Sequence, residues 1–372
     1  MIIGVPREIK PEERRVAATP DGVARLVRNG HQVIIEHNAG AGSGIFDASY
    51  KEAGATVKRD AKELWGKADM ILKVKEPLEP EIALAREGQI VFTFFHLAAD
   101  KHLTVSLLRK KIIGIAYETV QLADGSLPIL RSMSEIAGYL AVQLAARGLE
   151  AINGGRGVVM GGIPGLSPAR VTIVGGGSTG VRAAEAAAGM GARVTILEID
   201  RKRINTLRGM LGKRAHVKLP SARDVVHEVT QSDVVIGALL NPGARASRVV
   251  TRAMVKKMHP GSVIVDVAVD QGGCCETIRP TTHDKPFYSL YGVVHCGITN
   301  MPSAVPRSST LALTKESLPF ALEIANKGYF AAARENPAIM KGIDLLEGKL
   351  TNPAVAKAFG MAYHVFNGKP ST

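Results

Sequence analysis

Residues 170–180 read RVTIVGGGSTG, and this stretch decides the fold of the second half of the chain. A β-rich run leads directly into Gly175, Gly177 and Gly180, and the helix-forming sequence VRAAEAAAGMG follows. The pattern is G-x-G-x-x-G in a strand–turn–helix context. The first glycine permits a tight turn, the second lets the backbone approach a pyrophosphate, and the third lets the helix pack on the strand. Phosphates then lie at the positive end of the helix, so the stretch predicts a dinucleotide-binding site.

The acid that follows this loop narrows the choice of dinucleotide. The next expected strand, 194–198, ends in Glu198, where a carboxylate can bind the ribose hydroxyls of NAD. A Walker A loop is excluded, because Val-Arg follows Gly180 in place of Lys and Ser or Thr. Glu198 would repel the 2′-phosphate of NADP, whereas the basic run Arg201–Arg203 could accept it. We therefore expect NAD as the cofactor and leave NADP open.

Short apolar runs alternate with helical patterns in the rest of the chain, which is typical of an α/β fold. Strands are expected at residues 2–5, 32–36, 70–74, 90–95 and 112–117, with helices near 20–29, 78–87 and 100–110. Such alternation implies a parallel sheet that helices cover on both faces. A long helical pattern at 134–152 and a Gly-rich stretch at 153–165 precede a second series from Arg170. From Ser308 onward the pattern is helical, with little strand signal.

The length of the chain, 372 residues, suits two domains. We predict an α/β protein with two Rossmann-like, doubly wound parallel-sheet domains and a catalytic cleft between them. Residues 1–130 and 306–372 are expected to form a discontinuous substrate-binding and catalytic domain. Residues 131–305 are expected to form the NAD-binding domain.

The net charge of +13 raises nucleic acid and anionic membranes as partners. The excess is local, because residues 201–257 hold 13 basic and 3 acidic side chains. This segment contains no Phe, Trp or Tyr for stacking on bases and shows no helix-turn-helix signal. We therefore expect no nucleic-acid partner and interpret the segment as a solvated basic face. A sharper hypothesis is that it helps to draw in an anionic cofactor.

The cysteines and the apolar runs bear on location and on metal binding. The three cysteines are Cys274, Cys275 and Cys296, an odd number with two adjacent. The N-terminus shows no signal peptide, and no apolar run reaches the roughly 18 residues that a membrane span needs. We therefore expect a reducing, cytoplasmic setting without a membrane partner. The spacing of Cys and His fits no standard zinc pattern, so we expect no metal site.

Four polar residues at expected strand ends are candidates for catalysis. Lys75 closes MILKVK, His96 closes IVFTFF, Arg15 lies in the loop after the first strand, and Asp270 closes SVIVDVAVD. A dehydrogenase needs a cation for the substrate carboxylate and an acid/base for the proton. Each residue also has an ordinary structural interpretation. A single His after a strand is usually structural, single cations are usually on the surface, and Asp270 could cap a helix.

Six motifs together resemble the alanine dehydrogenases and their relatives, the α-subunits of proton-translocating pyridine nucleotide transhydrogenases. They are IGVPREIKPEERRVAATP (3–20), DMILKVKEP (69–77), FFHLAAD (94–100), MSEIAGYLA (133–141), VDVAVDQGGCCETIRPTTH (265–283) and NMPSAVPRSST (300–310). The resemblance covers nearly the whole chain. It implies a reversible, NAD-dependent oxidative deamination of L-alanine to pyruvate and ammonium, and a homohexamer.

The resemblance also implies roles for individual residues. Arg15 and Lys75 match the cations that bind the substrate, His96 matches the general acid/base, and Asp270 matches a second catalytic acid/base. Besides Gly175, Gly177 and Gly180, the positions that match the cofactor shell are Ser134, Ser178, Glu198, Arg203, Leu239, Leu240, Val267, Arg279, Ile298, Asn300 and Met301.

The chain departs from the pattern of this family at several positions. Glu198 stands where the family often has Asp, and Pro220 stands where relatives often place a serine at the adenine. Some relatives bind magnesium through a Glu and a His, but here Lys327 follows Glu323 at the histidine position, so no such site is expected. The alternative interpretation is a transhydrogenase-type NAD(H)-binding domain, which would not need Lys75, His96 and Asp270. The physiological direction of the reaction is left open.

Overall fold

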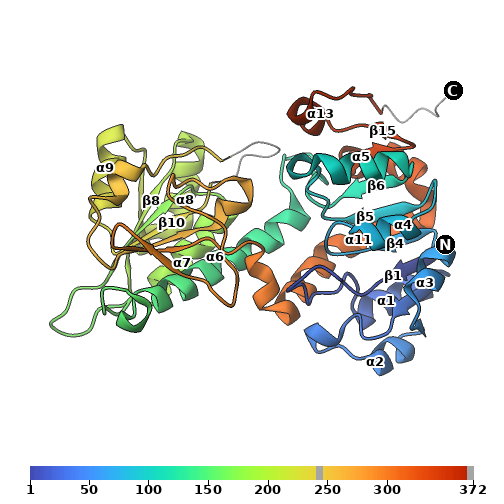
Figure 1. Cartoon of the computed structure of the whole chain (residues 1–372), viewed down its shortest axis with the longest axis horizontal. Coiled ribbons are helices and arrows are strands. Elements are labelled where there is room, and N and C mark those ends of the chain that lie inside the picture. The colour runs from blue at the N-terminus through green and yellow to red at the C-terminus, as the bar shows by residue number, and fades with distance from the viewer. Residues whose placement is uncertain (240–245, 367–372) are drawn as a thin grey trace. The chain divides into compact units, whose positions relative to one another are not determined.

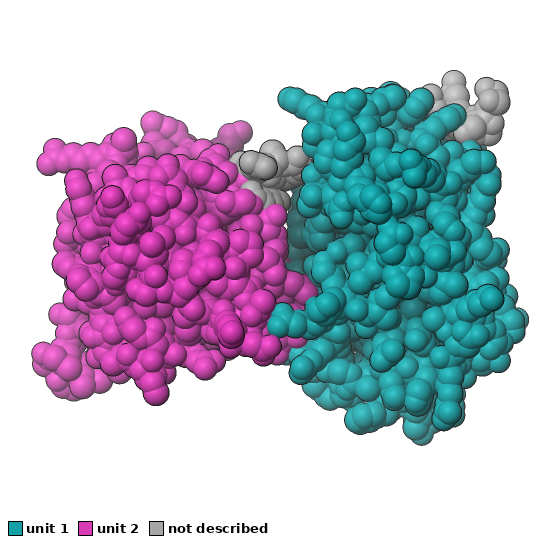
Figure 2. All heavy atoms as spheres, in the orientation of Figure 1, with its two compact units in different colours: residues 1–133, 305–372 teal, residues 134–304 magenta. Residues whose placement is uncertain are grey.

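The computed structural model describes residues 1–239 and 246–366, which form two compact units (Figures 1 and 2). Unit 1 consists of Met1–Met133 and the C-terminal segment from Val305, and unit 2 of Ser134–Ala304. Helix α6 (Pro128–Gly148) starts in unit 1 and continues into unit 2. It begins six residues before the expected start at 134, at a proline whose fixed φ suits the first turn of a helix.

Unit 1 is built on an eight-stranded sheet with the order β15-β14-β6-β5-β4-β1-β2-β3. The six parallel strands are β1 (Ile2–Val5), β2 (Gln32–Glu36), β3 (Thr56–Lys58), β4 (Met70–Leu72), β5 (Ile90–Thr93) and β6 (Ile113–Ala116). Their order, 3-2-1-4-5-6, is that of a doubly wound Rossmann fold. The helices are α1 (Pro20–Arg28), α2 (Asp47–Glu52), α3 (Ala61–Lys67), α4 (Glu79–Leu84), α5 (Lys101–Arg109), α11 (Pro306–Glu335), α12 (Pro337–Gly342) and α13 (Pro353–Phe359).

The C-terminal segment completes the sheet of unit 1, which the sequence did not predict. Strands β14 (Ile343–Leu346) and β15 (Lys349–Leu350) form an antiparallel hairpin, and β14 pairs antiparallel with β6. Glu347 and Gly348, at the turn, both have positive φ (50° and 83°), as a tight hairpin turn requires. The helical pattern with little strand signal that was expected from Ser308 missed these two strands, because a strand of four residues is too short to show a clear alternation of polar and apolar side chains.

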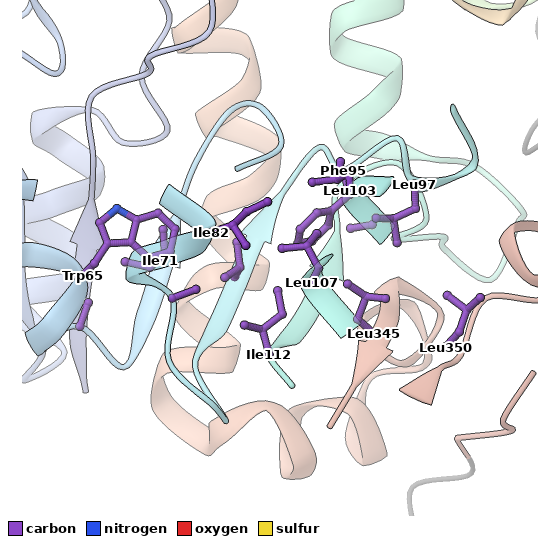
Figure 3. Close-up of a cluster of buried hydrophobic side chains, with 14 of the residues drawn as sticks. Trp65, Ile71, Ile82, Phe95, Leu97, Leu103, Leu107, Ile112, Leu345 and Leu350 are labelled. Atoms are coloured by element: carbon purple, nitrogen blue, oxygen red, sulfur yellow. The ribbon is translucent and has the colours of Figure 1, made fainter. Parts of the chain in front are cut away.

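The core on one face of this sheet joins residues from both parts of unit 1 (Figure 3). Trp65 of α3, Phe95 after β5 and Leu107 of α5 are fully buried, and Leu345 and Leu350 of the hairpin pack into the same cluster. Burial of each such large apolar side chain contributes roughly 1.5–3 kcal/mol. The hairpin is therefore part of the core of unit 1.

Unit 2 is built on a seven-stranded sheet with the order β12-β13-β11-β10-β7-β8-β9. From β9 to β13 the order is again 3-2-1-4-5-6 with parallel pairing, and β12 adds an antiparallel edge. The strands are β7 (Arg170–Val174), β8 (Arg193–Leu197), β9 (Ala215–Lys218), β10 (Val234–Gly237), β11 (Val263–Asp266), β12 (Tyr288–Leu290) and β13 (Val293–Cys296), and the α-helices within this unit are α7 (Ser178–Gly189), α8 (Arg201–Leu211), α9 (Ala222–Thr230) and α10 (Arg252–Val255). The predicted α/β class with two Rossmann-like, doubly wound sheets is confirmed.

None of the helices in residues 1–239 and 246–366 is both long enough and apolar enough to cross a membrane.

The close packing of β1 against α3 yields a stability prediction for unit 1. A Cβ atom on Gly4 would lie 2.7 Å from Leu64 Cδ2 and 2.9 Å from Ala68 Cβ. We expect Gly4→Ala to destabilise unit 1 by about 1–3 kcal/mol through overpacking. Trp65, the only tryptophan, is buried in unit 1, so its fluorescence during guanidinium unfolding reports on this unit.

Gly66 of α3 is the matched control, because a Cβ atom there would meet no heavy atom within 4 Å. We expect Gly66→Ala to leave the stability unchanged or to raise it by up to ~1 kcal/mol, since glycine weakens a helix relative to alanine. A Gly4→Ala protein that unfolds at the same denaturant concentration as the unsubstituted protein would contradict the packing argument.

Candidate active site

The carboxyl edge of the unit 1 sheet brings Arg15, Lys75 and His96 together. Each follows a parallel strand (β1, β4 and β5), and such strands end at the same edge of a sheet. Arg15 is 3% exposed, and its Nε donates to Glu13 Oε1 over 2.7 Å while Nη1 contacts Met133 Sδ at 3.1 Å. Glu13 also forms an ion pair with Arg15 through its second oxygen. The guanidinium group of Arg15 is thus oriented by a neighbouring carboxylate.

Lys75 is a buried cation in a positively charged neighbourhood. Burial lowers the pKa of its ammonium group, and the positive charges of Arg15 and Lys10 lower the pKa further, against smaller opposing effects from acids. Thr93 Oγ1 donates to the backbone carbonyl of Lys75 over 2.8 Å, which ties the end of β4 to the end of β5. A carboxylate bound beside these cations would relieve their repulsion, so the arrangement suits a carboxylate ligand.

His96 lies near Arg15 and Lys75 and has an unusual backbone conformation. It has φ 51° and ψ 39°, the left-handed region that residues other than glycine seldom adopt. The imidazole keeps exposed surface on one side and stacks on Phe94, with ring centroids 5.7 Å apart and planes 2° apart. Loss of solvation on the protein side lowers the pKa of the imidazole, and the charges of Lys75, Lys10 and Arg15 lower it further. The ring is therefore neutral at pH 7 and can accept a proton.

Three residues of this edge were not singled out from the sequence. Lys10 forms an ion pair with Glu76, which follows Lys75 in the chain. Glu118 follows β6 and accepts the backbone N–H groups of residues 95 and 96. Desolvation raises the pKa of the Glu118 carboxyl to about 7, although these N–H donors and Lys75 act in the opposite direction. Lys10 and Glu76 lie within two of the motifs quoted above, whereas Glu118 lies in none of them and only follows an expected strand.

In unit 2 the glycine loop has the geometry that the sequence predicted for it. Gly175 has φ 103°, and Gly177 is the residue before the first turn of α7. A Cβ atom on Gly180 would lie 2.0 Å from the carbonyl oxygen of Gly175, so only glycine fits there. A Cβ atom on Gly177 would meet no heavy atom within 4 Å. The loop is thus closely packed at its third glycine and open at its second, where a phosphate group can approach backbone N–H groups.

Glu198 and Arg203 hold this loop from the side of β8 and α8. Glu198 Oε2 accepts the N–H of Gly176 over 2.8 Å, and Oε1 accepts those of Ile199 and Asp200 over 2.7 and 2.9 Å. Arg203 Nε donates to the carbonyl oxygen of Gly176 over 2.8 Å. A carboxylate has about four acceptor positions, so these three bonds leave room for a ligand hydroxyl on Glu198.

Asp270 and Val267 lie on a short 3-10 turn, η5 (Val267–Gln271), directly after β11. Asp266, the last residue of β11, is fully buried and accepts the N–H groups of Ala268 and Cys275 over 3.0 and 2.9 Å. Burial raises the pKa of the Asp266 carboxyl, against the effect of these bonds. The Asp270 side chain is exposed at the carboxyl edge of the unit 2 sheet. Asp266 therefore fixes the turn from which Asp270 projects.

The remaining predicted cofactor residues belong to unit 2. Arg279 is exposed, and its guanidinium carbon lies 4.3 Å from the centroid of the Tyr288 ring. Asn300 has φ 57°, and Ile298 and Met301 beside it are buried. Ser134 lies on α6, Ser178 starts α7, and Leu239 follows β10. Leu240 lies outside the described residues.

The side chains that metals prefer are not gathered in the described part of the chain. Within residues 1–239 and 246–366, no group of three or more His, Cys, Asp or Glu side chains is placed to hold a metal ion. The Lys327 ammonium lies 3.0 Å from Glu323 and 2.7 Å from Glu335, and so pairs with both acids. Cys274, Cys275 and Cys296 are buried thiols.

The strand orders and the glycine loop define the class of the chain as a two-unit α/β protein with a nucleotide-binding Rossmann unit. Residues 4–137 match the family description "Alanine dehydrogenase/PNT, N-terminal domain", and residues 141–353 match "Alanine dehydrogenase/PNT, C-terminal domain". The chain belongs to the alanine dehydrogenase/PNT family.

Individual relatives cover almost the whole chain. It is 54% identical to the alanine dehydrogenase of Methanococcus maripaludis over 98% of each chain. Among solved structures, an L-alanine dehydrogenase is 46% identical, with a TM-score of 0.92 over 97% of this chain and 99% of that one. A transhydrogenase from Sinorhizobium meliloti is 26% identical, with a TM-score of 0.80 over 95% of this chain and 100% of that one.

The charges around His96 lead to a prediction about its pKa. Replacing Lys75 by Met removes a positive charge that disfavours the imidazolium ion, so we expect Lys75→Met to raise the pKa of His96. Histidine-selective NMR titration measures this, with the His96 signal assigned by its loss in His96→Ala. The exposed Lys62→Met on α3 is the control and should leave the His96 titration in place. An unchanged or lower pKa in Lys75→Met would contradict the electrostatic account.

Proposed function

We propose that the chain is an NAD-dependent L-alanine dehydrogenase. It converts L-alanine, NAD and water to pyruvate, ammonium, NADH and a proton, and it runs the reverse reaction. The observation that carries this proposal is the group Arg15, Lys75 and His96 at one sheet edge, in a chain with 54% identity to an alanine dehydrogenase. A transhydrogenase-type domain, the alternative, has no need of these three residues.

The substrate-side residues act on the carboxylate and on the proton. Arg15 and Lys75 bind the carboxylate, which replaces their mutual repulsion by attraction. Lys75 also polarises the carbonyl oxygen of pyruvate in the reverse direction. His96, neutral at pH 7, accepts the proton released when water adds to the imine of alanine, and Asp270 is the second acid/base in the steps that add water and release ammonia.

The glycine loop and Glu198 favour NAD as the cofactor. The open space at Gly177 and the N–H groups at the start of α7 suit a pyrophosphate, and the remaining acceptor position of Glu198 suits a ribose hydroxyl. The negative charge of Glu198 opposes the 2′-phosphate of NADP. Bound NAD would supply the acceptor for the hydride from Cα of alanine. The other positions named from the resemblance, from Ser134 to Met301, remain proposed contacts of the cofactor.

A cytoplasmic location and a homohexamer complete the proposal. The three cysteines are buried free thiols, which suits a reducing compartment. Light scattering of the purified protein measures the number of subunits directly. No metal ion and no nucleic acid is part of the proposed activity.

The activity itself is the test of this proposal. We expect purified protein to reduce NAD with L-alanine, and to oxidise NADH with pyruvate and ammonium, at higher kcat/KM than with NADP or NADPH. His96→Ala should lower kcat on the order of 10²–10⁴-fold, as the loss of one acid/base does. Binding of NADH without turnover of alanine or pyruvate would favour the transhydrogenase-type alternative.

Gly177, directly before α7, and Gly189, the last residue of α7, provide a matched test of the cofactor site. A Cβ atom on Gly177 or on Gly189 meets no heavy atom within 4 Å, so both alanine variants should fold. We expect Gly177→Ala to weaken NADH binding by about tenfold or more, because the methyl group occupies the space of the pyrophosphate. Gly189→Ala, at the far end of the helix, should bind NADH as the unsubstituted protein does. Equal affinities, measured by NADH fluorescence, would overturn the pyrophosphate assignment.

A further inference from the structure

Glu118 lies where two neighbouring strands of unit 1 end. Strands β5 and β6 are paired in parallel, with Thr93 opposite Ala116. The chain then leads to His96 after β5 and to Glu118 after β6. Glu118 Oε1 accepts the N–H of His96 over 2.6 Å and that of Phe95 over 3.2 Å, and Oε2 lies 3.3 Å from the latter. One carboxylate thus takes both consecutive amides of the loop that carries His96.

These two hydrogen bonds act on the strained part of the loop. His96 has φ 51° and ψ 39°, a conformation that costs free energy for a residue with a Cβ atom. It persists because its surroundings hold it, and two adjacent N–H groups that donate to one carboxyl group are such a restraint. The direction of the imidazole follows from this backbone, which also places the ring parallel to Phe94.

The C-terminal hairpin, β14–β15, is hydrogen-bonded to the segment that contains Glu118. Asp344 of β14 is 2% exposed and accepts Thr119 Oγ1 over 3.1 Å and Asn352 Nδ2 over 3.0 Å. Thr119 is the next residue after Glu118, so this bond fixes the chain from which Glu118 projects. The segment from Val305 onward thereby connects to the His96 loop without itself supplying a proposed catalytic side chain.

We propose that Glu118 is a positioning residue for His96, whose loop it holds in the left-handed conformation that aims the imidazole at the substrate. The proposal rests on the role of His96 given above and adds a residue to which that account assigns no part. Two further charged groups act on the Glu118 carboxyl: Lys75, and Asp344 of β14. A role through Lys75 would change substrate binding, whereas a role through His96 changes the chemical steps, so kinetics separate the two.

Steady-state kinetics of Glu118→Ala and Glu118→Gln test this role. Glu118→Ala removes both acceptor oxygens, and we expect kcat for alanine oxidation to fall by about 10–100-fold, the scale for a misplaced catalytic group. The KM for L-alanine should change by less than about threefold. Glu118→Gln keeps one oxygen for the two N–H groups and should recover most of kcat. A Glu118→Ala enzyme with unchanged kcat, or with a raised KM alone, would overturn the proposal.

A double-mutant cycle shows whether Glu118 acts through His96. In a His96→Ala background, Glu118→Ala should cause no further loss of kcat, since the group that it positions is already absent. An equal loss in both backgrounds would overturn the proposal, because it would show that Glu118 acts elsewhere. Glu87→Ala is the control, because Glu87 is an exposed acid of unit 1 that pairs with Lys111 over 3.1 Å. It should leave kcat in place.

Hydrogen exchange of the peptide over residues 93–99 gives a readout that does not depend on activity. We expect faster exchange in Glu118→Ala than in the unsubstituted protein or in Glu118→Gln, with the other peptides of unit 1 unchanged. Unchanged exchange in this peptide would count against the restraint. An unsubstituted protein that does not turn over alanine would overturn the proposed function, while the exchange experiment would still decide whether Glu118 holds the loop.

Discussion

Backbone N–H groups in the loops that leave parallel strands must find acceptors, and in both units carboxylates supply them. An acid on one strand or loop accepts an N–H from the neighbouring one, which fixes the loop without a regular ladder. The bonds between neighbours are Glu36 to Arg7 (2.9 Å), Glu8 to Val74 (2.7 Å), Glu118 to His96 (2.6 Å) and Glu198 to Gly176 (2.8 Å). Asp266 accepts the N–H of Cys275 (2.9 Å) within the loop that follows its own strand. The loops that carry the proposed catalytic and cofactor residues are therefore held by charges, and each charge needs a counterpart.

At the edge of unit 1 most of these acids already have cations. Lys73 is fully buried against Glu8 and Glu81, with Nζ–O distances of 3.1 and 2.5 Å. Burial is the main cause of the lowered pKa values of Lys75 and His96, and the positive charges of Arg15 and Lys10 lower both values further. A bound carboxylate would add a negative charge and so favour protonation of the imidazole. In the proposed function, this charge would prepare His96 to return a proton in the reverse direction.

The features that sequence predicts well here are those in which neighbouring residues carry the signal. The glycine loop before α7 depends on residues within one strand–turn–helix, and the apolar runs of β1 or β11 are readable because both faces are buried. Glu118 had no such signal, because in the sequence an acid after a strand resembles a surface charge. Only the pairing of β5 with β6 brings it next to the His96 backbone. The β14–β15 hairpin was missed for a related reason, since its core contacts come from distant segments.

Several cations of the basic segment 201–257 make specific contacts within unit 2. Arg203 holds the glycine loop, Arg208 Nη2 donates to the carbonyl oxygen of Val217 over 3.0 Å, and Arg214 Nη2 donates to that of Met210 over 2.8 Å. Lys218 pairs with Glu228 at 2.7 Å. Arginines near the end of α8 satisfy carbonyl groups and complement the helix dipole, so part of the excess stabilises unit 2 internally. The hypothesis that the segment also helps to draw in an anionic cofactor stays a prediction.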